Sequence, residues 1–205
     1  MWFAISMSIP YLLILFRFLL APTILCLAWV MKEQATQLVL ILMFLGLLSD
    51  IFDGIIARKQ GVSTEKMRRL DSQTDLIFWL SVAVGCYLIY PHLIIASKYG
   101  VMALIAMEAL CYLVSLLKFG KETCTHAFLS KIWGLTLLAT FTSLLGFAFG
   151  GWILATCIVI GLISQLDVVL IVLILPKWTH DVPSFYHAIL IRKGIAFRKS
   201  KYLNS

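Results

Sequence analysis

Four aspartates stand in two closely spaced pairs in the first half of the chain. Asp50 and Asp53 are three residues apart, and Asp71 and Asp75 are four residues apart. Either spacing places both carboxylates of a pair on one face of a helix. Because only a short segment separates the pairs, the two helices can pack together and bring all four acids into one cluster.

A cluster of four carboxylates is stable only if its charge is balanced. The candidate ligand atoms are all oxygens, and no His or Cys stands at helical spacing beside them. That donor set favours a hard divalent cation, Mg²⁺ or Mn²⁺, over zinc. The simpler alternative is that the aspartates lie in water at the ends of their helices.

The elements that must position this cluster are apolar. Of the 205 residues, 61% are hydrophobic and 13% are charged, whereas a soluble domain carries about 25% charged residues. Six apolar stretches account for the excess, and each is near the roughly 20 residues that a helix needs to cross a bilayer. These stretches are Tyr11–Met31, Leu38–Ile56, Leu76–Ala96, Tyr99–Leu117, Ile132–Phe149 and Trp152–Leu175.

We therefore expect an all-α integral membrane protein with six transmembrane helices. Unpaired backbone groups are not tolerated in lipid, and the strict alternation of a transmembrane barrel is absent. Residues 1–205 are expected to form one membrane-embedded domain, with residues 176–205 as a tail on the membrane surface or in solvent. The polar segment Lys59–Leu70 is expected to join the second and third helices. The first helix lacks a basic leading segment and a cleavage site, so we expect it to be retained.

Basic residues are distributed unevenly between the two sides of the predicted bundle. Five lie between the second and third helices, three between the fourth and fifth, and six in the tail, whereas only Lys32 and Lys98 lie on the other side. The positive-inside rule predicts that both termini and the aspartate cluster face the cytoplasm, in a bacterial inner membrane. The net charge of +7 then faces anionic headgroups and phosphorylated substrates, and no nucleic-acid partner is expected.

The residues around the aspartates resemble the signature of the CDP-alcohol phosphatidyltransferases, D-x2-D-G-x2-A-R-x8-G-x3-D-x3-D. The chain keeps every spacing and every fixed residue except one, because Met67 stands where the family has its second glycine. The opening Ile9–Arg17 is similar to that of the phosphatidylglycerolphosphate synthases in this family. Family members are often homodimers, so the resemblance also implies a homodimer.

The resemblance implies a metal-dependent reaction of phospholipid biosynthesis. The donor would be a CDP-linked lipid, most often CDP-diacylglycerol. A hydroxyl of a small alcohol would attack its lipid-linked phosphorus, and CMP would leave. Asp50, Asp53 and Asp71 would hold Mg²⁺ or Mn²⁺. Asp75 would complete the metal site and act as the general base.

The resemblance also assigns a nucleotide site. Gly54 and Ala57 would leave room for the cytidine, and Arg58 would hold the site together by ion pairing. Met67 places a long side chain where the family's glycine allows close approach, and we expect this side chain to reshape the nucleotide site.

Positive charge gathers at the predicted cytoplasmic ends of the fourth and fifth helices. This charge would bind an acceptor that carries its own phosphate, such as glycerol 3-phosphate. Ordinary positive-inside charge is the alternative explanation. The residues concerned are Lys118, Lys121, His126 and Lys131.

Three further charged residues lie inside apolar stretches. Arg17 would contact the substrate, pair with an acid in the bundle, or extend its side chain to the membrane surface. Glu108 and Asp167 are expected to make hydrogen bonds between helices or contacts between subunits, rather than to take part in catalysis.

Two other functions fit part of these features. A transporter of divalent cations or protons could use the aspartates as an ion path, but such proteins often show repeated halves with broken helices. Here all four acids come from one helix pair, and no second copy is evident. A catalytically inactive relative, kept for assembly, is the second alternative, and Met67 suggests it.

Overall fold

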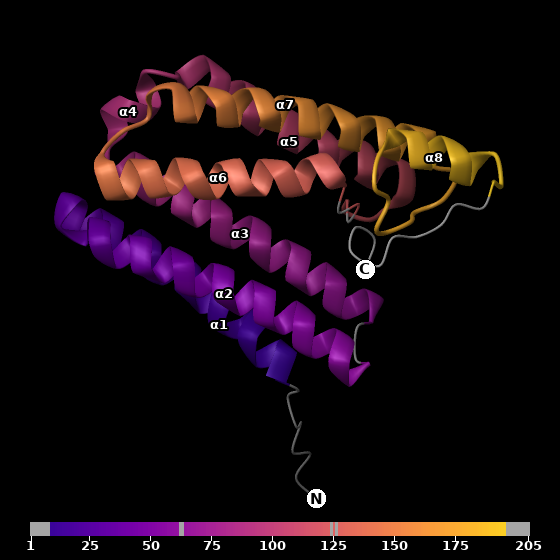
Figure 1. Cartoon of the computed structure of the whole chain (residues 1–205), viewed down its shortest axis with the longest axis horizontal. Coiled ribbons are helices and arrows are strands. Elements are labelled where there is room, and N and C mark those ends of the chain that lie inside the picture. Colours follow the sequence, from indigo (N-terminus) through magenta and orange to yellow (C-terminus); the bar gives the residue numbers. More distant parts are fainter. Residues whose placement is uncertain (1–8, 62–63, 124, 126, 196–205) are drawn as a thin grey trace, which may run out of the picture. The chain divides into compact units, whose positions relative to one another are not determined.

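The computed structural model describes residues 9–61, 64–123, 125 and 127–195 of the chain (Figure 1). Within these ranges the secondary structure is entirely helical, which confirms the all-α class. The elements are α1 (Ile9–Met31), η1 (Lys32–Ala35), α2 (Thr36–Gln60), α3 (Glu65–Ile89), α4 (Pro91–Ile95), α5 (Lys98–Phe119), α6 (Phe128–Phe147), α7 (Gly151–Ile174) and α8 (Phe185–Arg192).

Five stretches of the described residues are long and apolar enough to cross a membrane. The first, Ile9–Gln60, has 52 residues and contains α1, η1 and α2, and the other four correspond to α3, α5, α6 and α7. In each stretch, between 11% and 50% of an apolar window of 18 residues is buried inside the protein, so much of the apolar surface is exposed, which suits helices that face lipid. The count of six spans and the cytoplasmic termini stay predictions.

The segment Lys59–Leu70, expected as a linker, is helical over most of its length. Helix α2 continues to Gln60 and ends at Gly61, whose left-handed φ of 67° suits a glycine at a helix C-terminus. Helix α3 then begins one residue after Thr64, whose hydroxyl oxygen accepts a hydrogen bond of 3.2 Å from the backbone N–H of Met67. Apolar runs mark only the lipid-facing part of a helix, so the sequence pattern underestimated the lengths of α2 and α3.

The chain divides into two compact units, each of which is described by itself. Unit 1 comprises residues 1–92 and 144–148, and unit 2 comprises residues 93–143 and 149–205. The aspartates belong to unit 1, and the basic residues expected to bind the acceptor belong to unit 2.

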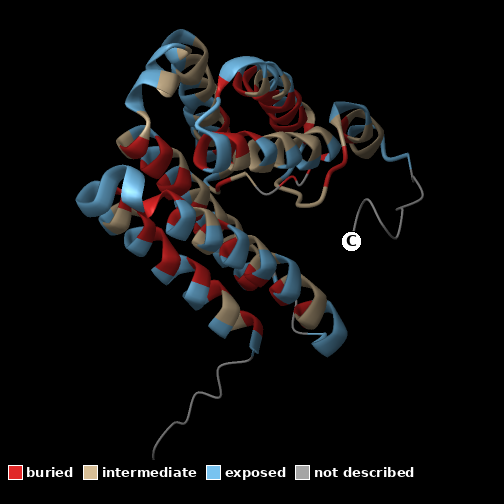
Figure 2. Ribbon diagram, turned by 60° about the vertical axis from the view of Figure 1, so that its left-hand side comes forward, coloured by how far each residue is buried: buried red, intermediate tan, exposed pale blue. Residues whose placement is uncertain are grey.

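In unit 1, α1 packs against both α2 and α3 (Figure 1). Buried and exposed residues alternate along these helices (Figure 2), so each helix has one face against its neighbours. A glycine lets α2 and α3 approach closely, because a Cβ atom at Gly46 would lie 2.1 Å from Cζ of Phe78. The core between the three helices contains Ile24, Ala28, Val39, Met43, Phe78, Val82 and Cys86.

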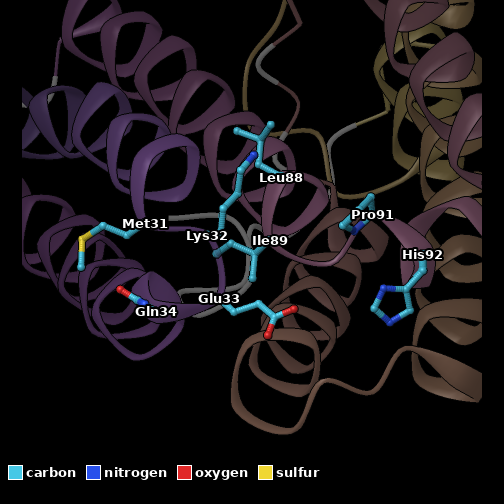
Figure 3. Close-up of a pocket in the computed structure, with 8 residues that line it drawn as sticks. All are labelled: Met31, Lys32, Glu33, Gln34, Leu88, Ile89, Pro91 and His92. Atoms are coloured by element: carbon cyan, nitrogen blue, oxygen red, sulfur yellow. The ribbon is translucent and has the colours of Figure 1, made fainter.

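An open pocket of about 590 Å³ lies in unit 1 where η1 joins α1 to α2 (Figure 3). Its lining includes Lys32, Glu33 and Gln34 from this connection and His92 from the start of α4. Gln34 is 16 residues from Asp50, which corresponds to roughly 24 Å along a helix. This pocket is therefore separate from the aspartates.

In unit 2, the segment after α7 packs back onto the helices. Asp167 of α7 accepts a hydrogen bond of 3.0 Å from the backbone N–H of Phe185, the first residue of α8. Val182 and Ala188 are fully buried against α7. The tail expected at residues 176–205 thus includes a helix with a buried apolar side, and residues 196–205 lie outside the described residues.

The close approach at Gly46 yields a stability prediction. Gly46→Ala would press a methyl group into the ring of Phe78, which is 1% exposed and enclosed on all sides. We expect the free energy of unfolding to fall by about 1–3 kcal/mol, the usual cost of overpacking. Thermal unfolding in detergent measures this change.

Gly134→Ala is the matched control, because a Cβ atom there meets nothing within 4 Å. This variant adds the same methyl group to a helix. Alanine forms helices better than glycine does, so the free energy of unfolding should stay equal or rise. Equal melting temperatures for the two variants would contradict the close packing at Gly46.

Candidate metal centre

The four aspartates come together through the packing of α2 and α3 against α1. Asp50 and Asp53 lie one helical turn apart on α2, and Asp71 and Asp75 lie one turn apart on α3. Asp50, Asp53 and Asp71 each offer a carboxylate oxygen, and these oxygens all lie within 4.8 Å of one another. The predicted convergence of the two pairs is therefore present.

The guanidinium group of Arg17, from α1, lies at the centre of the cluster and ion-pairs with every aspartate. Its Nη1 donates to Asp50, at 2.7 Å, and to Asp75. Its Nη2 donates to Asp71, at 3.0 Å, and to Asp53. Of the three roles expected for Arg17, pairing with an acid in the bundle is the one that the structure displays.

The depth of the cluster differs from one carboxylate to the next. The side chains of Arg17 and Asp53 are each 1% exposed, whereas those of Asp50, Asp75 and Asp71 are 37%, 30% and 24% exposed. The cluster is thus buried at Asp53 and partly exposed at the other three carboxylates.

The donor set fits a divalent cation. The group consists of three carboxylate oxygens from two helices, and it contains no nitrogen or sulfur ligand among the described residues. Such a donor set is typical of Mg²⁺ or Mn²⁺ sites, in which phosphate oxygens take the remaining coordination positions. One arginine against four aspartates also leaves an excess of negative charge. Asp75 is joined to the other three through Arg17.

Met67, the one departure from the family signature, is buried beside the signature alanine. It is 4% exposed and packs in a small cluster with Ala57 and Ile14, against which Tyr11 also rests. The cluster joins α1, α2 and α3. The space beside Ala57 is thus filled by the Met67 side chain.

The remaining two residues of the expected nucleotide site lie next to each other on α2. A Cβ atom on Gly54 would stand 3.5 Å from Nη1 of Arg58, so the Arg58 guanidinium folds over the glycine. Arg58 itself is exposed. Each of the four carboxylates forms an ion pair with Arg17, a residue that the signature does not contain.

The residues expected to bind the acceptor have several contacts inside unit 2. Lys118 donates to the backbone carbonyls of Val172 and Leu173, at 3.0 and 2.7 Å, close to the end of α7. Lys121 lies 4.7 Å from the ring centre of Trp178, in a cation–π contact. Lys131 is an exposed residue of α6. His126 lies outside the described residues.

The two other intramembrane acids form hydrogen bonds between elements, as expected. Glu108 of α5 accepts a hydrogen bond of 2.8 Å from the side-chain amide of Gln165 on α7. Asp167 holds the N-terminus of α8. Each contact joins two elements, which is a structural role, although Oδ2 of Asp167 and Oε1 of Gln165 are buried without a hydrogen-bond partner.

A family model for the CDP-alcohol phosphatidyltransferases matches residues 7–164. The match contains α1 to α6 and the first half of α7, and therefore the four aspartates and Arg17. No curated protein and no solved structure matches the chain. The chain is a member of the CDP-alcohol phosphatidyltransferase family.

Proposed function

We propose that the chain transfers a phosphatidyl group from CDP-diacylglycerol to the hydroxyl of a small alcohol, with release of CMP. Phosphatidyl transfer from a CDP-alcohol is the reaction of its family, and family members generally depend on a divalent cation. The observation that carries the proposal is the meeting of Asp50, Asp53 and Asp71 within 4.8 Å. A cluster of this kind serves a reaction at phosphate.

In this proposal the carboxylates have different tasks. Asp50, Asp53 and Asp71 would hold the cation, which would neutralise phosphate charge and polarise the phosphoryl oxygens as a Lewis acid. Asp75, one helical turn beyond Asp71 and 30% exposed, takes the proton from the acceptor hydroxyl. Its half-open position suits a base that must meet a substrate from the aqueous side.

The acceptor that we propose is glycerol 3-phosphate. The opening Ile9–Arg17 supports it, as does the positive charge of Lys118, Lys121, His126 and Lys131, which would attract a phosphorylated alcohol. We also propose that the chain is a homodimer in a bacterial inner membrane, with its active site toward the cytoplasm. The uneven distribution of basic residues supports this orientation.

The reaction is tested by incubating the purified protein with CDP-diacylglycerol, Mg²⁺ or Mn²⁺ and a panel of alcohols, and measuring CMP. Asp75→Asn should lower kcat by about 10²–10⁴-fold, the usual contribution of a general base. Binding of Mn²⁺ should change less, because three other carboxylates remain.

Asp181→Asn is the matched control, because it makes the same substitution outside the cluster. Asp181 has a φ of 56°, a left-handed conformation that asparagine adopts readily, so the backbone is not strained by the exchange. CMP release by Asp75→Asn at the wild-type rate would contradict the role of Asp75. Release of CMP without any metal would contradict the metal-dependent mechanism.

Met67 yields a second test of the donor site. Met67→Ala removes the side chain that fills the space beside Ala57, so KM for CDP-diacylglycerol should fall if the cytidine binds there. The variant should also lose about 2–5 kcal/mol of stability, the usual cost of emptying a buried methionine site.

Met43→Ala separates these two effects, because Met43 is fully buried on α2 in a different part of the unit 1 core. It should lose stability without any change in KM. An unchanged KM in Met67→Ala would show that the cytidine does not use this space.

The burial of Met67 also favours a second candidate function, that of an inactive relative kept for assembly. In that case wild type releases no CMP with any acceptor although it binds Mn²⁺. Met67→Gly, which completes the family signature, would then create the activity. CMP release by wild type excludes this candidate.

A further inference from the structure

The contacts of Arg17 are distributed in a specific way between two helices. Nη1 bridges Asp50 of α2 to Asp75 of α3, and Nη2 bridges Asp53 of α2 to Asp71 of α3. Each terminal nitrogen therefore joins one carboxylate from each helix. The Arg17 side chain of α1 thus lies between the two acidic pairs and joins them.

We propose that Arg17 is an exchangeable internal counter-ion, which holds the four carboxylates when cations are absent and releases them when divalent cations bind. The inference rests on the metal use in the proposed function, but it concerns a residue outside the family signature. Arg17 is in this role a positioning residue, since it acts on the carboxylates rather than on the substrate.

The first argument is competition for the same oxygens. Arg17 contacts one oxygen of every carboxylate in the cluster. A cation held by Asp50, Asp53 and Asp71 needs oxygens of these residues, and it would also lie beside a fixed positive charge. Two cationic groups within one cluster repel each other strongly in a medium of low dielectric constant.

The second argument is that Arg17 alone does not complete the site. Arg17 carries one positive charge and contacts four carboxylates, and the cost of leaving carboxylate charge unbalanced inside a membrane protein is high. The Nε of Arg17 is also buried without a hydrogen-bond partner. An unpaired buried donor is unfavourable, so a move of Arg17 away from the carboxylates would relieve a polar group that lacks a partner here.

The third argument is that the Arg17 side chain can move toward the N-terminus of α1. It is eight residues from Ile9, the first residue of α1, which is roughly 12 Å along the helix axis. Side chains of a helix point toward its N-terminus, and a long arginine can extend along an apolar surface while its charge approaches water. A change of rotamer would therefore carry the guanidinium away from the carboxylates and toward this end of the helix, with α1 in place.

The experiment measures Mn²⁺ binding by electron paramagnetic resonance in the purified full-length protein, without donor or acceptor. Arg17→Met keeps a long apolar side chain and removes the competing charge, so it should bind Mn²⁺ about tenfold more tightly. Arg17→Lys should fall between wild type and Arg17→Met, because one ammonium group cannot reproduce the planar fork. Arg192→Met, the same exchange at an exposed position of α8, should bind like wild type.

The change in melting temperature that Mn²⁺ causes is a readout that a purely structural cross-link would not move. Without metal, Arg17→Met should melt well below wild type, and Mn²⁺ should raise its melting temperature more than that of wild type. Adding Asp75→Asn to Arg17→Met should raise the metal-free melting temperature, because it removes a repelling charge. The same change in wild type should lower it, because it removes an ion pair.

Weaker or unchanged Mn²⁺ binding by Arg17→Met would overturn the proposal and make Arg17 a permanent part of the metal site. Absence of Mn²⁺ binding in both wild type and Arg17→Met would overturn it together with the metal-dependent function. Tighter binding by Arg17→Met, with no CMP release by wild type, would support the counter-ion and contradict only the proposed transfer.

Discussion

Unit 1 depends on the balance of charge between Arg17 and four aspartates inside an apolar helix bundle. Each carboxylate in the centre of a lone membrane helix costs roughly 2.5–3.5 kcal/mol, and so does an arginine. Neither α1, α2 nor α3 would therefore be stable in lipid with its charged residues exposed there. Packing the three helices together turns five unfavourable groups into one ion-paired cluster, so the same interaction that forms the site also selects the arrangement of the helices.

The core around this cluster explains how the site can be partly open and still well defined. Asp53 and Arg17 are almost completely buried, whereas the three other carboxylates are partly exposed. Removing one partner of a buried ion pair typically costs 3–5 kcal/mol, because the other charge is left without a partner. The deep pair therefore fixes the register of α1 against α2, while the other three carboxylates stay partly exposed.

Local features of this site could be predicted from sequence, because they depend on helical periodicity alone. The spacings of Asp50 to Asp53 and of Asp71 to Asp75 determine which residues share a face. The central position of Arg17 was harder to predict, since it depends on how α1 is rotated against α2 and α3, whose Asp50 and Asp75 are 33 and 58 residues away from Arg17 along the chain. An arginine in an apolar stretch indicated that a partner was needed, but it did not identify the partner.

The limits of helices and the contacts of the lysines were also beyond the reach of the sequence patterns. Hydropathy reports where lipid begins, whereas α2 and α3 continue past that point until Gly61 and Thr64 supply their ends. Lys118 was expected to bind an acceptor because of its charge. Its two contacts with carbonyls of α7 come from a packing between helices that no local pattern encodes.

Met67 presents the clearest conflict between stability and function in this chain. A glycine at this position would leave space beside Ala57, and a methionine fills it with apolar contacts to Ile14 and Tyr11. Dispersion contacts of this kind stabilise the junction of α1, α2 and α3, which is also the junction that holds the carboxylates in place. In the proposed function, a donor site beside Ala57 would therefore differ in shape from one built with glycine. Methionine is unbranched and flexible, so its side chain could move aside when a donor binds.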